Sequence, residues 1–159
     1  MSRTLPEQMT APEVDVLSPM LTREGESWTA DYQGLTLRTA LQPIFSISHK
    51  RVVGYEALIR AFDTDNAAVL PLHLFELPSS DAENLLLDRL CRYLHIRNYS
   101  GFQDQLNWLF LNVSPRVVSA GNRADSFFGE LLEKTGLPPH RIVMEIVEQP
   151  TDDAERLRE

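Results

Sequence analysis

The sequence of 159 residues contains a single cysteine, Cys91, and no long apolar run. One cysteine excludes a disulfide within the chain and a metal cluster held by several thiolates, so we expect a reducing compartment and a cytoplasmic location. The N-terminus lacks the apolar core of a signal peptide, and no window approaches the roughly 18 apolar residues of a membrane span. Cys91 itself is expected to be a small buried residue.

Clusters of basic residues are also missing. The chain has 15 Lys and Arg against 23 Asp and Glu, a formal net charge of -8, and no basic run. Because binding to DNA or RNA rests on basic patches, we predict neither as a partner. The sequence contains no glycine-rich phosphate loop, and its four histidines lack the i, i+4 spacing that would indicate zinc.

The N-terminal segment, residues 1–28, differs in composition from the remainder of the chain. It contains three prolines, scattered acidic residues and no periodic apolar pattern. Such a segment buries too little apolar area to offset the entropy of ordering it, so we predict a disordered tail or linker there. Residues 29–159 are then expected to form one domain, since 43% hydrophobic and 24% charged residues are ordinary for a globular protein.

Two apolar runs around a polar turn predict a hairpin of strands. Residues 35–47 alternate and then become wholly apolar, residues 48–51 are polar, and residues 52–59 are apolar again. Two strands this close in sequence are expected to pair antiparallel. Pro43 lies inside the first run, which predicts a sheet edge or a strand boundary at that point.

The remainder of the chain alternates between helical and strand patterns. Helices are predicted over residues 82–98 and 125–135, and strands over 108–111 and 142–144, the latter continuing toward Glu148. The wholly apolar run 108–111 predicts a strand buried on both faces, as in a parallel sheet. This alternation indicates an α/β domain in which functional groups collect at the C-terminal ends of the strands.

Three residues with oxygen donors lie at or near the ends of predicted strands: Glu56, Asn112 and Glu145. Carboxylates and a side-chain carbonyl are the ligands that a hard divalent cation prefers. Taken one at a time these residues have simpler explanations. A glutamate in an apolar strand can face solvent or pair with an arginine such as Arg60, and an asparagine can start a turn. Their recurrence at successive strand ends favours a magnesium or manganese site.

Four motifs occur in the order and with about the spacing of one known family: QPI at 42–44, GYEALIR at 54–60, LNVSP at 111–115 and EIVE at 145–148. On these motifs the chain resembles the EAL-domain family of bacterial cyclic di-GMP phosphodiesterases. The resemblance implies a modified (β/α)8 barrel with an antiparallel first strand, of which this chain contains about half. Val147 departs from the family, which usually has threonine there, and the family's later catalytic motifs find no counterpart in this sequence.

The resemblance also implies roles for individual residues. It implies that Glu56, Asn112 and Glu145 bind the metal, Mg²⁺ or Mn²⁺. Glu56 and Glu148 are the implied catalytic acidic residues. Gln42, Leu58 and Arg60 resemble the positions that bind the cyclic dinucleotide, and a guanidinium suits a phosphate because of its fixed charge and planar fork.

Three hypotheses about function follow. The first is metal-dependent hydrolysis of cyclic di-GMP to the linear dinucleotide pGpG, by a domain that is inactive as this 159-residue chain. The second is a domain that binds cyclic di-GMP without cutting it. The third is structural: half a barrel leaves open sheet edges, so the chain is expected to pair with another chain, for example with a second copy of itself.

Overall fold

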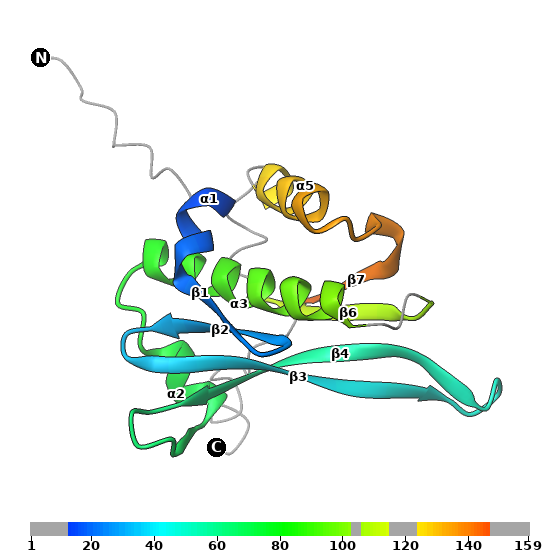
Figure 1. Ribbon diagram of the computed structural model, residues 1–159, viewed down its shortest axis with the longest axis horizontal. Helices are drawn as coiled ribbons and strands as arrows, with labels where there is room; N and C mark the ends of the chain where they lie inside the picture. The colour runs from blue at the N-terminus through cyan, green and yellow to red at the C-terminus, as the bar shows by residue number, and fades with distance from the viewer. Residues whose placement is uncertain (1–12, 103–105, 115–123, 147–159) are drawn as a thin grey trace, which may run out of the picture.

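The computed structural model describes residues 13–102, 106–114 and 124–146. These residues form a mixed sheet with helices against it (Figure 1). In chain order the elements are α1 (Val14–Leu17), η1 (Ser18–Met20), β1 (Leu21–Glu24), β2 (Ser27–Tyr32), β3 (Leu35–Ser46), β4 (Arg51–Phe62), β5 (Ala68–Val69), α2 (Pro71–Glu76), α3 (Asp81–Gly101), β6 (Trp108–Val113), α5 (Ala124–Thr135), η2 (Pro139–Arg141) and β7 (Ile142–Ile146).

The sheet has the strand order β1-β2-β3-β4-β6-β7, and the short β5 pairs with β4. Strands β1 to β4 are antiparallel to their neighbours, whereas β4, β6 and β7 are parallel. Helix α3 lies against β2, β3, β4 and β6 and also contacts α5, whereas α2 contacts β4 (Figure 1). The α/β class and the parallel strands are confirmed, and over the described residues the sheet is open. Among those residues no helix combines the length and the apolar character needed to cross a bilayer.

The hairpin of β3 and β4 confirms the two strands predicted around the polar turn, and it projects well beyond the helices (Figure 1). The strands pair from Thr36 opposite Phe62 to Ser46 opposite Arg51, with one register shift after Ile44. Strand β2 pairs with β3 only at residues 35–37, so β3 is a sheet edge at Pro43. This confirms the predicted edge, where the missing N–H of proline leaves no unmade ladder bond.

Helix α3 confirms the predicted helix and extends it at both ends, but the helix is not amphipathic at its centre, because residues 87–96 are all buried. Its N-terminus is capped because Ser80 Oγ accepts a hydrogen bond from Glu83 N, while the Glu83 carboxylate accepts one from Ser79 N. The hydrogen bonds that the Glu83 carboxylate accepts from Ser79 N and Ser79 Oγ lower the pKa of Glu83. Near its C-terminus, the side-chain amide of Asn98 bonds both the N–H and the C=O of Trp28 on β2, at 2.8 and 2.9 Å. The helix therefore joins the sheet through polar groups as well as through apolar contacts.

Two sequence predictions need correction. The predicted disordered segment is wrong for residues 13–28, because Val14 and Leu17 of α1 are fully buried and β1 and β2 extend the sheet. Residues 1–12 lie outside the described residues. Strand β6 is not buried on both faces either, since Leu109 and Leu111 are fully buried whereas Trp108 is 50% exposed. Residues 108–111 include no polar residue, so the sequence does not indicate that only alternate side chains of this strand are buried.

Helix α3 contains a buried histidine whose protonation opposes folding. His95 is 6% exposed, its Nδ1 lies 2.9 Å from Thr39 Oγ1, and burial lowers its pKa to about 4. In the unfolded chain an imidazole titrates near pH 6.5, so the unfolded state binds the proton first as the pH falls. We therefore expect the free energy of unfolding to decrease from about pH 6.5 toward pH 4.

The variant His95→Gln should reduce this pH dependence by about 1 to 2 kcal/mol between pH 7 and pH 5. Urea denaturation at the two pH values measures the difference. His49→Gln is the matched control for the substitution, because His49 is exposed in the turn of the hairpin. Equal pH dependence in wild type and His95→Gln would contradict the assignment.

Candidate functional site

The candidate site lies on the face of the sheet turned away from α3. Side chains alternate along a strand, and partners in register share a face. Thr39 bonds His95 of α3, and Ala57, Ile59 and Leu111 are buried, which places the odd-numbered positions of β3, β4 and β6 toward the helix. The opposite face includes Gln42 on β3, Glu56, Leu58 and Arg60 on β4, Asn112 on β6 and Glu145 on β7.

Two of the three expected metal ligands are in direct contact. Asn112 Nδ2 donates a hydrogen bond of 2.9 Å to Glu56 Oε1, and both side chains are half-buried. This bond joins β4 to the C-terminal end of the parallel strand β6. When its amide nitrogen faces Glu56, the Asn112 carbonyl oxygen remains available as a ligand. The structure thus brings together residues that are 56 positions apart in the sequence.

Glu145 and Gln42 adjoin this pair in register. Glu145 lies opposite Asn112 on the neighbouring strand, and Gln42 lies opposite Glu56. Both side chains are exposed. Four polar side chains on four adjacent strands therefore form one band across the open face, with the carboxylates of Glu56 and Glu145 on either side of the amide of Asn112.

Arg60 does not form the ion pair with Glu56 that was the simpler alternative. Its guanidinium donates from Nη1 to the backbone oxygen of Ile59 at 2.9 Å, and the carboxylate of Glu56 accepts from Asn112 instead. Leu58 is half-buried between them on β4. The other expected acidic residue, Glu148, lies outside the described residues.

The donor set suits a hard divalent cation but supplies only part of a coordination shell. Two carboxylates and a carboxamide, with no sulfur or imidazole, are the ligands that Mg²⁺ and Mn²⁺ prefer. Within residues 13–102, 106–114 and 124–146, no group of three or more His, Cys, Asp or Glu side chains is arranged to hold a metal. The side chains of Glu56, Asn112 and Glu145 are chemically suited to bind Mg²⁺ or Mn²⁺. A complete coordination shell needs oxygen ligands in addition to these three residues.

An aromatic floor next to the site was not recognised from the sequence. Phe110 lies opposite Glu56 in register, and its ring contacts that of Trp108 edge to face, with centroids 6.4 Å apart. The ring also covers Gly54, where a Cβ would lie 2.5 Å from Phe110 Cε2 and 2.9 Å from the backbone oxygen of Trp108. Glycine is thus required at position 54 by close packing, which the sequence does not reveal until the register is known.

A buried charge network supports the end of β6 from the helix side. Asp88 is 8% exposed, forms an ion pair with Arg92 one turn along α3, and accepts from Ser114 N just beyond β6. Burial raises the pKa of Asp88 against the opposing effect of Arg92, and burial lowers the pKa of Arg89. Arg89 also lies over the ring of Phe127, 4.6 Å from its centroid. The network holds the backbone two residues beyond Asn112.

Comparison with known proteins gives one family and a set of solved structures. The sequence model of the EAL domain matches residues 28–159. A search of curated protein sequences finds no match. Among solved structures, a standalone EAL protein of Vibrio cholerae O395 in its c-di-GMP bound form is 23% identical, with a TM-score of 0.59 over 72% of this chain and 46% of that chain.

Two further structures have the same similarity of fold. BlrP1 of Klebsiella pneumoniae, in a complex with manganese and cyclic di-GMP, is 19% identical, with a TM-score of 0.59 over 97% of this chain and 36% of that chain. The YkuI protein of Bacillus subtilis, with an EAL domain and in complex with substrate c-di-GMP and calcium, is 28% identical. Its TM-score is 0.56 over 76% of this chain and 30% of that chain. This chain thus spans less than half the length of each.

The contact between Phe110 and Gly54 generates a stability prediction. Gly54→Ala should lower the free energy of unfolding by about 1 to 3 kcal/mol, because the backbone oxygen of Trp108 cannot move away from the new methyl group without disturbing β6. Gly129→Ala is the matched control. A Cβ at Gly129 on α5 meets no atom within 4 Å, so this variant should instead be more stable, by about 0.5 to 1 kcal/mol. Chemical denaturation compares the two, and equal changes would contradict the close contact.

Proposed function

Because this chain belongs to the EAL-domain family, we propose that its sheet is the first part of an EAL-type cyclic di-GMP phosphodiesterase domain. In this proposal β3 is the antiparallel first strand of a modified (β/α)8 barrel, and β4, β6 and β7 are the parallel strands that follow it. The helix α3 between β4 and β6, and α5 between β6 and β7, support the assignment because they alternate with strands as a barrel requires. A single cysteine favours a reducing compartment such as the cytoplasm for this activity.

The observation on which the proposal rests is the contact of Glu56 with Asn112, with Glu145 next to Asn112 in register. Glu56, Asn112 and Glu145 would hold a divalent cation, and Mg²⁺ or Mn²⁺ fits their oxygen donors. When bound, the cation would polarise a phosphoryl oxygen and increase the acidity of the attacking water. We propose Glu56 and Glu148 as the catalytic acidic residues. BlrP1 of Klebsiella pneumoniae, which has a similar fold, has been solved in complexes of cyclic di-GMP with manganese and with calcium, which supports such a site.

Gln42, Leu58 and Arg60 are proposed to bind the dinucleotide on the same face. Arg60 is exposed and four residues from Glu56, so its guanidinium is available for a phosphate. Gln42 is exposed opposite Glu56 and offers both a donor and an acceptor for a base edge or a ribose. Leu58 supplies an apolar surface between the two. The reaction proposed for the complete domain is hydrolysis of cyclic di-GMP to pGpG.

The 159-residue chain supplies only part of this site, so we expect it to bind cyclic di-GMP without hydrolysing it. Isothermal titration calorimetry with the full chain and Mn²⁺ measures binding, and chromatography of the nucleotides measures pGpG. Arg60→Ala should weaken binding about tenfold or more, because a guanidinium bond to phosphate contributes roughly 1.5 to 3 kcal/mol and about 1.4 kcal/mol corresponds to tenfold. Arg51→Ala is the matched control, since Arg51 is also exposed but lies at the tip of the hairpin.

Metal dependence separates the phosphodiesterase proposal from a domain that only binds the dinucleotide. In the first case Glu56→Gln should weaken both Mn²⁺ and dinucleotide binding, whereas in the second the dinucleotide should bind equally well without metal. No binding of cyclic di-GMP by the wild-type chain would overturn both. Formation of pGpG by the 159-residue chain would contradict its expected inactivity.

Pairing with a second copy of the chain is a further candidate, favoured by exposed apolar side chains on the hairpin and the outer strands. Ile47 is 87% exposed, Phe45 is 59% exposed and Ile146 on the edge strand β7 is 58% exposed. Burial of such groups between two copies would remove apolar surface from water and cover open strand edges. Light scattering after size exclusion should then give the mass of a dimer, and a monomer at all concentrations tested would exclude this candidate.

A further inference from the structure

Two arginines lie directly opposite each other on the site face. The register of β3 and β4 pairs Arg38 with Arg60, in the same even-numbered set as Gln42 opposite Glu56. Both side chains are exposed. Like charges directly across an antiparallel pair destabilise a sheet, so two guanidiniums at this position are unfavourable unless a negative group lies between or beside them.

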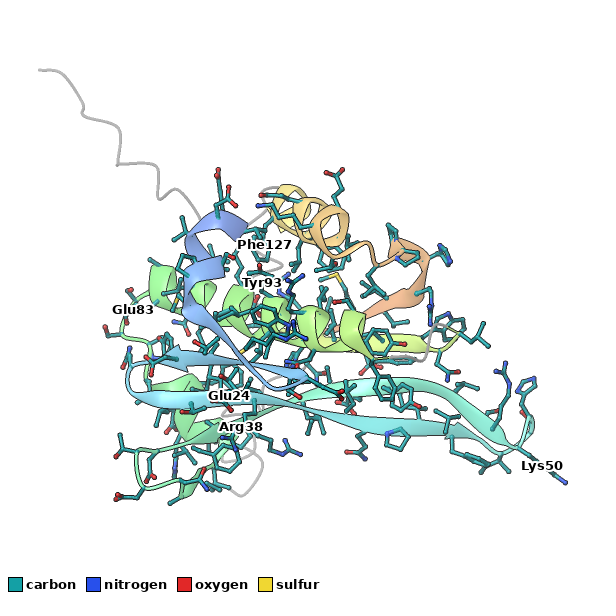
Figure 2. The ribbon with its side chains drawn as sticks, in the orientation of Figure 1. Glu24, Arg38, Lys50, Glu83, Tyr93 and Phe127 are labelled. Carbon is teal, nitrogen blue, oxygen red and sulfur yellow. The ribbon has the colours of Figure 1, made fainter. Side chains whose placement is uncertain are left out.

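Within the described residues, the charge available to balance this pair is incomplete. Glu24 Oε2 lies 3.7 Å from Arg38 Nη2, and the two side chains are 53% and 45% exposed, so this ion pair is weak (Figure 2). Arg60 bonds the backbone oxygen of Ile59, and no carboxylate in the described part of the chain lies within ion-pair distance of it. Only one of the two arginines, Arg38, therefore has an acidic partner, and that ion pair is exposed to solvent.

Arg38 is also held in place by an aromatic ring. Its guanidinium carbon lies 5.1 Å from the centroid of the Phe62 ring, which lies on the same face of β4. Contact with one side of the guanidinium leaves its edge free to donate, and stacking reduces the side-chain entropy lost when a ligand binds. Arg38 is thus partly ordered before any anion arrives.

We propose that Arg38 is a second phosphate-binding residue, which together with Arg60 takes one phosphate group of the cyclic dinucleotide. Glu24 occupies the guanidinium of Arg38 when the ligand is absent and is displaced by the phosphate. This inference rests on the proposed function, because it places Arg38 next to the arginine that is assigned to the substrate. Arg38 belongs to none of the four motifs that resemble the family, and only the strand register associates it with the site.

Calorimetry of the full chain with cyclic di-GMP tests the pair. Arg38→Ala should weaken binding about tenfold, comparable to Arg60→Ala. Arg38→Lys should retain part of the affinity, since a lysine keeps the charge but loses the planar fork. Glu24→Gln should strengthen binding by about threefold, because it removes a competing carboxylate next to the phosphate. A gain of affinity requires folded protein, so the result for Glu24→Gln tests the proposal even if the Arg38→Ala protein does not fold.

Two controls have matched charge changes away from the site. Arg51→Ala removes an exposed positive charge at the hairpin tip, and Glu26→Gln removes an exposed negative charge in the turn between β1 and β2. Neither should change affinity more than twofold at moderate salt, where surface charges at a distance are screened. If Arg38→Ala and Glu24→Gln bind like wild type while Arg60→Ala loses affinity, this inference is overturned and the proposed function stands. If the wild-type chain binds no cyclic di-GMP, both are overturned.

Discussion

The pairing of β3 with β4 is the constraint on which the arrangement of the site depends. A strand has two faces, and a slip by one residue would move every side chain of one strand to the other side of the sheet. The register in which Gln42 faces Glu56 sends Ala57 and Ile59 into the core against α3 and leaves Glu56, Leu58 and Arg60 on the open face. Apolar burial on one side therefore fixes the position of polar groups on the other.

Helix α3 makes polar contacts to β3, through Thr39, and to β2, the strand that pairs with the base of β3. Asn98 bonds both backbone groups of Trp28, and His95 meets the hydroxyl of Thr39. Such polar contacts are directional, so a shifted strand would leave buried donors and acceptors unpaired at a cost of about 1 to 3 kcal/mol each. The same helix supports β6 near the site through the Asp88 carboxylate. Directional polar contacts therefore occur on the side of the sheet that α3 covers as well as on the exposed side.

The sequence predicts the helices and strands of this fold better than it predicts the contacts between them. Periodicity and capping residues identified α3, the hairpin and the strands β6 and β7. The recurrence of oxygen donors near predicted strand ends identified Glu56 and Asn112, which the structure joins by a hydrogen bond, but Glu56 lies in the middle of β4 and not near its end. The strands β1 and β2 were missed because they are short and their alternation is broken by polar residues such as Arg23. The contacts of Gly54 and Arg38 depend on strand register, and no local pattern contains that information.

The register shift after Ile44 separates the tip of the hairpin from its base. Gly54 pairs with Ile44 and Val52 pairs with Phe45, so β4 has one extra residue, Val53, at this point. A bulge of this kind leaves its extra residue unpaired, bends the strand that carries it and increases the local twist. The tip of the hairpin therefore turns away from the direction of its base, while Gln42 and Glu56 remain paired in the base.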